Sequence, residues 1–241
     1  MKKIHVLFVC WFVFVLALSA AISSPLHYWK DVIQPRLSNG IVLQKIEGHL
    51  WRGSIDAAFP TLLNPVNIQW RLSLPLVNVQ VTSDDFTGWG AMSFGFSGID
   101  LWVDEARLGV DLLKPVAKSN DVNLDGSAFI VDRLFARLNY HSVVPEKWRG
   151  VGRFESINAN YAFGNTRQNV RLNQVSVEWV TRDKAQLMLV YSHKGKHLLT
   201  VEPTSKEELE ISIMPALLNE VGIPWSGDTE YPVAVLIEPL F

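Results

Sequence analysis

Apolar and polar residues alternate along most of the chain after residue 40. Segment 76–82 reads Leu-Val-Asn-Val-Gln-Val-Thr, and segment 175–179 keeps the same period up to Trp179. Because successive side chains of a β-strand point to opposite faces, this period of two predicts strands with one apolar face. Gly, Asn and Asp separate the alternating runs and predict turns. We therefore predict ten to twelve strands in an all-β domain, folded as a curved antiparallel sheet or an open half-barrel.

Little helix is expected beyond the N-terminus. Residues 215–221 have room for at most two helical turns, and residues 104–114 are compatible with either a strand or a short helical turn. Residues 122–131 predict two strand pieces that meet at a bend at Gly126, because glycine tolerates backbone angles that other residues avoid.

A tryptophan bracketed by glycines lies near the start of the β-rich region. Trp51 stands between Gly48 and Gly53, and Trp70 follows on a strand in which apolar and polar residues alternate. Glycine lets the backbone turn or lets a large ring lie against it, so this stretch predicts a turn or bulge covered by an indole. Large aromatic side chains usually pack in a core or on a sheet, and we interpret both tryptophans in this way. Stacking on a ligand is the alternative.

A similar stretch occurs in the second half of the chain. Trp148-Arg149-Gly150 repeats the triplet Trp51-Arg52-Gly53, and a strand that ends at Trp179 follows it. The spacing between the two tryptophans is 19 residues in the first stretch, which runs to Trp70, and 31 residues in the second. This difference leaves two interpretations open, a loose duplication of a β unit and a chance recurrence.

The N-terminus carries a hydrophobic run that is long enough to cross a membrane. Residues 4–22 are apolar except for His5 and Ser19, and Lys2 and Lys3 precede them. A helix of this length spans about 28 Å, close to the bilayer's hydrocarbon core of about 30 Å. We predict a single-pass anchor at 1–24, with the N-terminus held in the cytoplasm by the lysines. A cleaved signal peptide is the alternative, and both place the rest of the chain outside the cytoplasm.

A connector at 25–40 leads from the anchor to a β-rich domain at 41–241, which consists of one unit or of two loosely related ones. Pro25 ends the predicted helix, and Tyr28 and Trp29 follow where aromatic side chains favour a membrane–water interface. The single cysteine, Cys10, lies in the hydrophobic run. The domain is therefore expected to form neither a disulfide nor a Cys-ligated metal site.

Charge and motifs give no indication of catalysis. The net charge of −2 lacks the basic excess that nucleic acid attracts. His27 and His49 have no neighbour at metal-ligand spacing, Asp84 and Asp85 read as a solvated turn, and the acidic segment 121–126 lacks the closing Glu of a calcium loop. Nucleophile and phosphate-binding motifs are absent from the sequence. We predict that the chain is not an enzyme and has no catalytic residue, cofactor or metal.

Taken together, the anchor and the two Gly-Trp stretches resemble the protein N family of the bacterial type II secretion system. The matching positions are Gly48, Trp51, Gly53, Trp70, Trp148 and Gly150. The resemblance implies an inner-membrane protein that crosses the membrane once, with a periplasmic β domain and no enzymatic activity. It also implies contacts with the inner-membrane platform and the outer-membrane channel, in support of the export of folded proteins.

Two functions are compatible with these features. A secretion component would present sheet edges, which can pair with a strand of another protein. The alternative is an AsmA-like periplasmic protein that binds or transfers lipid, holding acyl chains against the apolar face of a curved sheet. The alternation alone does not distinguish the two, since a packed core and a lipid groove share it.

Overall fold

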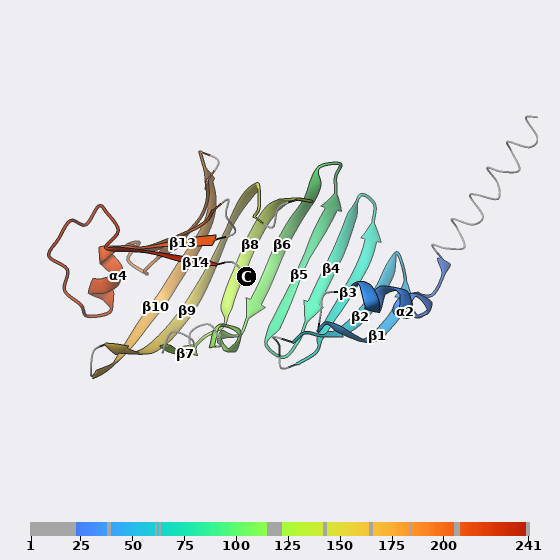
Figure 1. The fold of residues 1–241 in the computed structure, drawn as a ribbon, viewed down its shortest axis with the longest axis horizontal. Helices are drawn as coiled ribbons and strands as arrows, with labels where there is room; N and C mark the ends of the chain where they lie inside the picture. Colours follow the sequence, from blue (N-terminus) through green and yellow to red (C-terminus); the bar gives the residue numbers. More distant parts are fainter. Residues whose placement is uncertain are drawn as a thin grey trace, which may run out of the picture. The chain divides into compact units, whose positions relative to one another are not determined.

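The computed structural model describes residues 23–37, 40–60, 62, 64–114, 122–141, 144–163, 166–183, 185–204 and 208–239. These residues form mostly antiparallel β-sheet, which confirms the predicted all-β class. The chain divides into two compact units, residues 1–83 and residues 84–241 (Figure 1).

In its described part, the first unit has short helices followed by four antiparallel strands. The helices are η1 (Leu26–Trp29), α2 (Lys30–Ile33) and η2 (Gln34–Arg36), and the strands are β1 (Val42–His49), β2 (Arg52–Ala58), β3 (Val66–Ser73) and β4 (Leu76–Thr82). Each strand pairs with the next one along the chain. On β3 the predicted alternation is confirmed, since Val66 is buried whereas Gln69 and Arg71 are exposed.

The three helices cover part of the apolar face of this sheet. Leu43, Ile46 and Ala57 are buried there, and Leu26 and Ile33 pack against them. Residues 26–36 of the predicted connector are therefore packed onto the sheet through apolar contacts, which stabilise a fold with few other covering elements.

The second unit is a longer antiparallel sheet. Its strands are β5 (Phe86–Phe94), β6 (Gly98–Leu108), β7 (Val122–Gly126), β8 (Phe129–Asn139), β9 (Lys147–Phe163), β10 (Thr166–Arg182), β11 (Ala185–Tyr191), β12 (His197–Pro203), β13 (Glu208–Ile213) and β14 (Ala234–Pro239), and its helices are η3 (Val110–Leu113) and α4 (Pro215–Glu220). The strand order is β5-β6-β8-β9-β10-β11-β12-β13-β14, with β7 beside β9. In Figure 1, β13 and β14 overlap β9 and β10 and run at an angle to them. This sheet therefore curls rather than lying flat.

Strands β7 and β8 form one interrupted strand along the same edge of β9. Gly126 pairs with Ile157 and Phe129 pairs with Phe154, so the register continues across the break. Gly126 has a φ of +148°, and Ser127 donates from its backbone N to the Ser156 carbonyl oxygen at 2.8 Å. The predicted bend at Gly126 is confirmed.

Two other expectations are refined by the structure. Segment 104–114 takes both of the conformations left open, since β6 continues to Leu108 and η3 follows at Val110–Leu113. The described residues form fourteen strands instead of ten to twelve. The expected number was too low because alternation is hard to assign in short segments.

One face of the second unit is apolar across its whole width, and we call it the apolar face. Two cross-strand rows define it. The first row is Gly88, Ala106, Val131, Gly152, Val177, Val190, Leu199, Ile213 and Ala234, and the second is Gly90, Val103, Leu134, Gly150, Trp179, Met188, Val201, Ile211 and Leu236. Ala106, Val131, Val177 and Trp179 are its buried centre. Charged residues such as Arg107 and Arg153 occupy the opposite face, as alternation requires.

Among the helices that the structure describes, none is both long and apolar enough to span a bilayer. The predicted anchor at 1–24 lies outside the described residues, except for residues 23 and 24.

Candidate functional site

The first Gly-Trp stretch forms a tight hairpin between β1 and β2. Leu50 and Trp51 are its loop, and Gly48 pairs with Gly53 just before it. Gly48 has a φ of +88°, and the backbone of Arg52 leaves no room for a Cβ there. The turn was predicted from these glycines, and the backbone angle explains why one of them is required.

The indole that covers Gly53 comes from Trp70 rather than from Trp51. A Cβ on Gly53 would lie 2.5 Å from Cζ2 of Trp70, which is the cross-strand partner of this glycine. Trp70 Nε1 donates to the Leu50 carbonyl oxygen at 2.9 Å and so ties β3 to the hairpin loop. Trp70 is therefore a packing residue that holds the hairpin in place.

Trp51, unlike Trp70, is partly exposed and lines a pocket. Its side chain is 39% exposed and stacks on His49, with ring centroids 5.4 Å apart. Both residues line an open pocket of about 450 Å³ next to Glu47 and Arg52. Its lining includes Glu47, His49 and Ser54, and within the described residues no hydrogen bond joins these side chains, as a base paired with a nucleophile would require.

The second stretch repeats one feature of the first. Gly150 is the cross-strand partner of Trp179, as Gly53 is of Trp70, although the sequence spacings differ. The hydrogen bond of the indole is reversed, because here Trp148 of the triplet donates from Nε1 to the Val180 carbonyl oxygen at 3.0 Å. The two interpretations, a loose duplication of a β unit and a chance recurrence, both remain open.

Buried polar groups beside Trp148 bond to one another. Gln186 is 5% exposed and donates from Nε2 to the Glu146 carbonyl oxygen at 2.7 Å. The Thr181 hydroxyl lies 2.7 Å from Oε1 of Gln186 and accepts from the Trp148 backbone N at 3.1 Å. A buried network that satisfies its own members stabilises the fold, and we assign it a structural role.

The residues weighed as metal ligands do not come together. Within the described ranges no cluster of three or more His, Cys, Asp or Glu side chains could hold an ion. The His27 ring lies tilted against the Tyr28 ring, and the His49 ring stacks on Trp51. Residues 122–126 of the acidic segment form strand β7, whereas residue 121 lies outside the described part.

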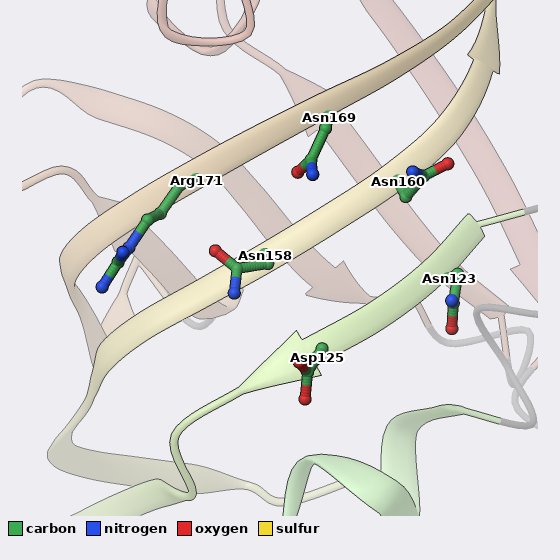
Figure 2. Close-up of a pocket in the computed structure, with 6 residues that line it drawn as sticks. All are labelled: Asn123, Asp125, Asn158, Asn160, Asn169 and Arg171. Carbon is green, nitrogen blue, oxygen red and sulfur yellow. The ribbon is translucent and has the colours of Figure 1, made fainter.

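A polar pocket lies on one side of β7, β9 and β10, and we call its lining the asparagine array (Figure 2). The pocket is open and has a volume of about 650 Å³. Its six lining residues form two cross-strand rows. One row is Asn123, Asn160 and Asn169, and the other is Asp125, Asn158 and Arg171.

Sequence reasoning did not find this array. Asn158 and Asn160 lie in a segment that alternation predicts as a strand, and Asn123 and Asp125 lie in another. Only the pairing of β7 with β9 and of β9 with β10 brings the two rows together. The available signal was a repeated asparagine at alternate strand positions, where this residue is disfavoured.

The first strand of the first unit, β1, and the last strand of the second unit, β14, differ in how their outer edges are covered. The Gln34 side chain bonds to the edge of β1, accepting from the Leu43 backbone N and donating to the Ile41 carbonyl oxygen, both at 2.8 Å. By contrast, β14 pairs with β13 and with no other strand that the structure describes. Its side chains Val235, Leu236 and Ile237 are 49%, 46% and 63% exposed.

No family model, curated protein or solved structure matches this chain.

Proposed function

We propose that this protein is a non-enzymatic component of a type II secretion system that binds a partner protein through the outer edge of β14. The proposal includes the predicted inner-membrane anchor at 1–24 and a periplasmic location for the two β units. The observation that supports this proposal most is a contrast between two edges. The Gln34 side chain bonds to the edge of β1, whereas the edge of β14 is apolar and open in the described part of the chain.

An open edge strand offers a row of backbone donors and acceptors to another strand. Folded proteins commonly protect such edges with charges, proline or a covering segment, because an unprotected apolar edge associates with other chains. In β14, three neighbouring apolar side chains are at least 46% exposed. The partner that fits this edge is an extended, apolar strand of another envelope protein, added to the sheet by main-chain hydrogen bonds.

The resemblance of the two Gly-Trp stretches to the protein N family supports the choice of assembly. It points to the inner-membrane platform and the outer-membrane channel as the proteins that would supply such a strand. Gly53 and Gly150 each stand opposite a tryptophan, so the matching positions serve the fold of the units that would present the edge.

Photocrosslinking in cells tests this proposal. A photoreactive residue is placed at Val235 or at Ile237 of the full-length protein, and captured proteins are identified by mass spectrometry. A matched probe at Val151 serves as the control, because this side chain is 45% exposed but lies in the interior strand β9. We expect platform or channel proteins from the β14 positions and not from Val151.

Two substitutions give the same test a functional readout. Val235→Lys and Ile237→Lys place charges on the edge, which oppose strand addition. Secretion of a folded substrate is expected to fall in cells that carry them, whereas Val151→Lys leaves it unchanged. Normal secretion with both edge lysines, or crosslinks to phospholipid alone, would rule out this role.

Lipid handling is the second candidate, and the apolar face of the second unit favours it. Two rows that cross nine strands carry no polar residue, and several members, including Val201 and Ile211, are only partly buried. A phospholipid acyl chain would lie against such a surface with no unpaired polar group beneath it. The opposite face carries Arg107 and Arg153, which such a chain would avoid.

A pair of matched substitutions separates lipid binding from packing. Val201→Gln changes the apolar face, and Val151→Gln makes the same chemical change on the opposite face. The full-length protein is purified, and its retained phospholipids are measured by mass spectrometry. We expect Val201→Gln to reduce phospholipid retention several-fold and Val151→Gln to leave it unchanged. Equal retention by both variants would exclude lipid binding at this face.

A further inference from the structure

Asparagine is unfavourable in β-strands, yet the asparagine array places four of them on one side of three adjacent strands. The cost arises because its side chain packs poorly on a pleated surface and competes for backbone hydrogen bonds. Alternating side chains on the other side of the same strands, such as Leu124, Ala159 and Val170, follow the usual apolar pattern. The polar side is therefore not explained by the needs of the fold.

The side-chain amides of the array are left available for hydrogen bonds to a ligand. Within the described residues, Asn123, Asn158, Asn160 and Asn169 make no side-chain hydrogen bond. Arg171 donates from Nε to Oδ1 of Asn173 at 3.1 Å, which leaves its two terminal nitrogens for other acceptors. Each amide offers two donors and one acceptor oxygen, so the pocket presents both kinds of group side by side.

From this arrangement we infer that the asparagine array binds a neutral glycan. A sugar hydroxyl donates one hydrogen bond and accepts others, and neighbouring hydroxyls on a ring match a surface on which amide donors and acceptors alternate. The carboxylate of Asp125 and the guanidinium of Arg171 lie at two ends of one row and add stronger, charge-assisted bonds. This site does not depend on the secretion or lipid proposals.

The spacing of the array suits a chain of sugars that crosses the strands. Neighbouring strands lie about 4.8 Å apart and alternate residues on one strand about 6.8 Å apart. The first distance is close to the length of one pyranose residue in an extended glycan. A chain running from β7 to β10 would therefore meet Asn123, Asn160 and Asn169 with successive sugars.

Other ligand classes fit the array less well. In the lining, the one negative charge of Asp125 offsets the one positive charge of Arg171, so neither a free anion nor a cation is favoured. The pocket holds a single carboxylate, and no group of side chains in the described part has the composition of a metal site. The ligand class that fits the array best is therefore a neutral molecule rich in hydroxyl groups.

Isothermal titration of the purified full-length protein with neutral oligosaccharides tests the inference. The probes are a hexamer of β-1,4-linked N-acetylglucosamine and a hexamer of β-linked glucose. We expect at least one to bind, with an affinity that changes less than twofold when the salt concentration rises, because no net charge is neutralised. Zwitterionic phosphatidylethanolamine vesicles serve as a competing probe.

Threonine substitutions separate ligand binding from folding. Asn158→Thr and Asn160→Thr replace a poor strand former with a good one, so the melting temperature should be kept or raised. Oligosaccharide affinity should nevertheless fall at least tenfold. Asn78→Thr on β4, an exposed strand asparagine in the first unit, is the matched control and should leave affinity unchanged.

The titrations of the wild type, the two threonine variants and the Asn78 control decide whether the array binds a glycan. Binding that is lost in both threonine variants and kept in the Asn78 control supports it. If neither oligosaccharide binds, the inference is overturned, and it is also overturned if both threonine variants still bind. Strongly salt-dependent binding to the vesicles alone would assign the array to a phosphate-bearing headgroup and would also overturn it.

Discussion

Gly53 has no room for a side chain. Besides Cζ2 of Trp70, a Cβ at this position would meet the Glu47 carbonyl oxygen at 2.6 Å, and a backbone atom cannot move aside cheaply. We predict that Gly53→Ala destabilises the protein by about 1–3 kcal/mol, the usual cost of overpacking. Denaturant unfolding measures this change in the free energy of unfolding.

Gly95→Ala is the control for this prediction. A Cβ at Gly95 would lie 3.5 Å from its nearest neighbour, the Gly98 carbonyl oxygen, which is ordinary van der Waals distance. The free energy of unfolding should then change by less than about 0.5 kcal/mol. Equal effects of the two substitutions would show that contact with Trp70 does not constrain Gly53.

His197 makes stability depend on pH. Burial lowers the pKa of His197, the hydrogen bond to the Leu199 carbonyl oxygen acts in the opposite direction, and the charge of Arg182 lowers it further. The folded protein therefore holds this proton less tightly than the unfolded chain. The stability contribution of the neutral ring is complete above the unfolded pKa of about 6.5 and is lost as the pH falls toward the folded pKa.

His197→Gln should remove this dependence. The free energy of unfolding is measured between about pH 8 and about pH 5, across the range in which histidine titrates. We expect the variant to lose less stability than the wild type over this interval. His193→Gln, at an exposed turn position, should retain the wild-type slope. A wild-type slope in His197→Gln would contradict the assignment.

At the scale of elements, one side chain closes the edge of β1. Gln34→Ala removes both hydrogen bonds from Gln34 to β1, at about 0.5–1.5 kcal/mol each, and exposes two backbone groups. We predict a loss of about 1–3 kcal/mol in the free energy of unfolding, together with faster amide exchange at Leu43. An opened edge should also increase self-association, which light scattering measures.

Gln44→Ala provides the comparison for Gln34. Gln44 is exposed on β1 itself, and its backbone carbonyl, which accepts from Lys30 Nζ at 3.2 Å, survives the substitution. Neither amide exchange at Leu43 nor self-association should change. If Gln34→Ala behaved in the same way, the helices rather than the Gln34 amide would be what protects this edge.

At the scale of the whole molecule, each unit has its own apolar cluster. Leu43, Ile46 and Ala57 form one, and Ala106, Val131, Val177 and Trp179 are the centre of the other. Because a domain folds around its own core, we predict that residues 84–241 fold when expressed alone. Circular dichroism should show a β-sheet spectrum with a cooperative thermal transition. A fragment without such a transition would mean that the second unit depends on residues 1–83.

The sequence was sufficient for the class of fold and for the faces of its strands. The alternation on β3 correctly separates Val66 from Gln69 and Arg71, and Gly126 correctly marks the bend between β7 and β8. These are local properties, since the period of two and the freedom of glycine act within a few residues. The count of strands was less accurate because short alternating runs carry little signal.

The tertiary structure decided which residues meet. Three contacts join residues from different elements. Trp70 covers Gly53, Gln34 closes the edge of β1, and the asparagine array brings three strands together. Each contact depends on the register between strands, and a shift of one residue would turn the array to the other face. Local patterns determine which side of a strand a residue occupies, whereas only the pairing of strands determines what lies beside it.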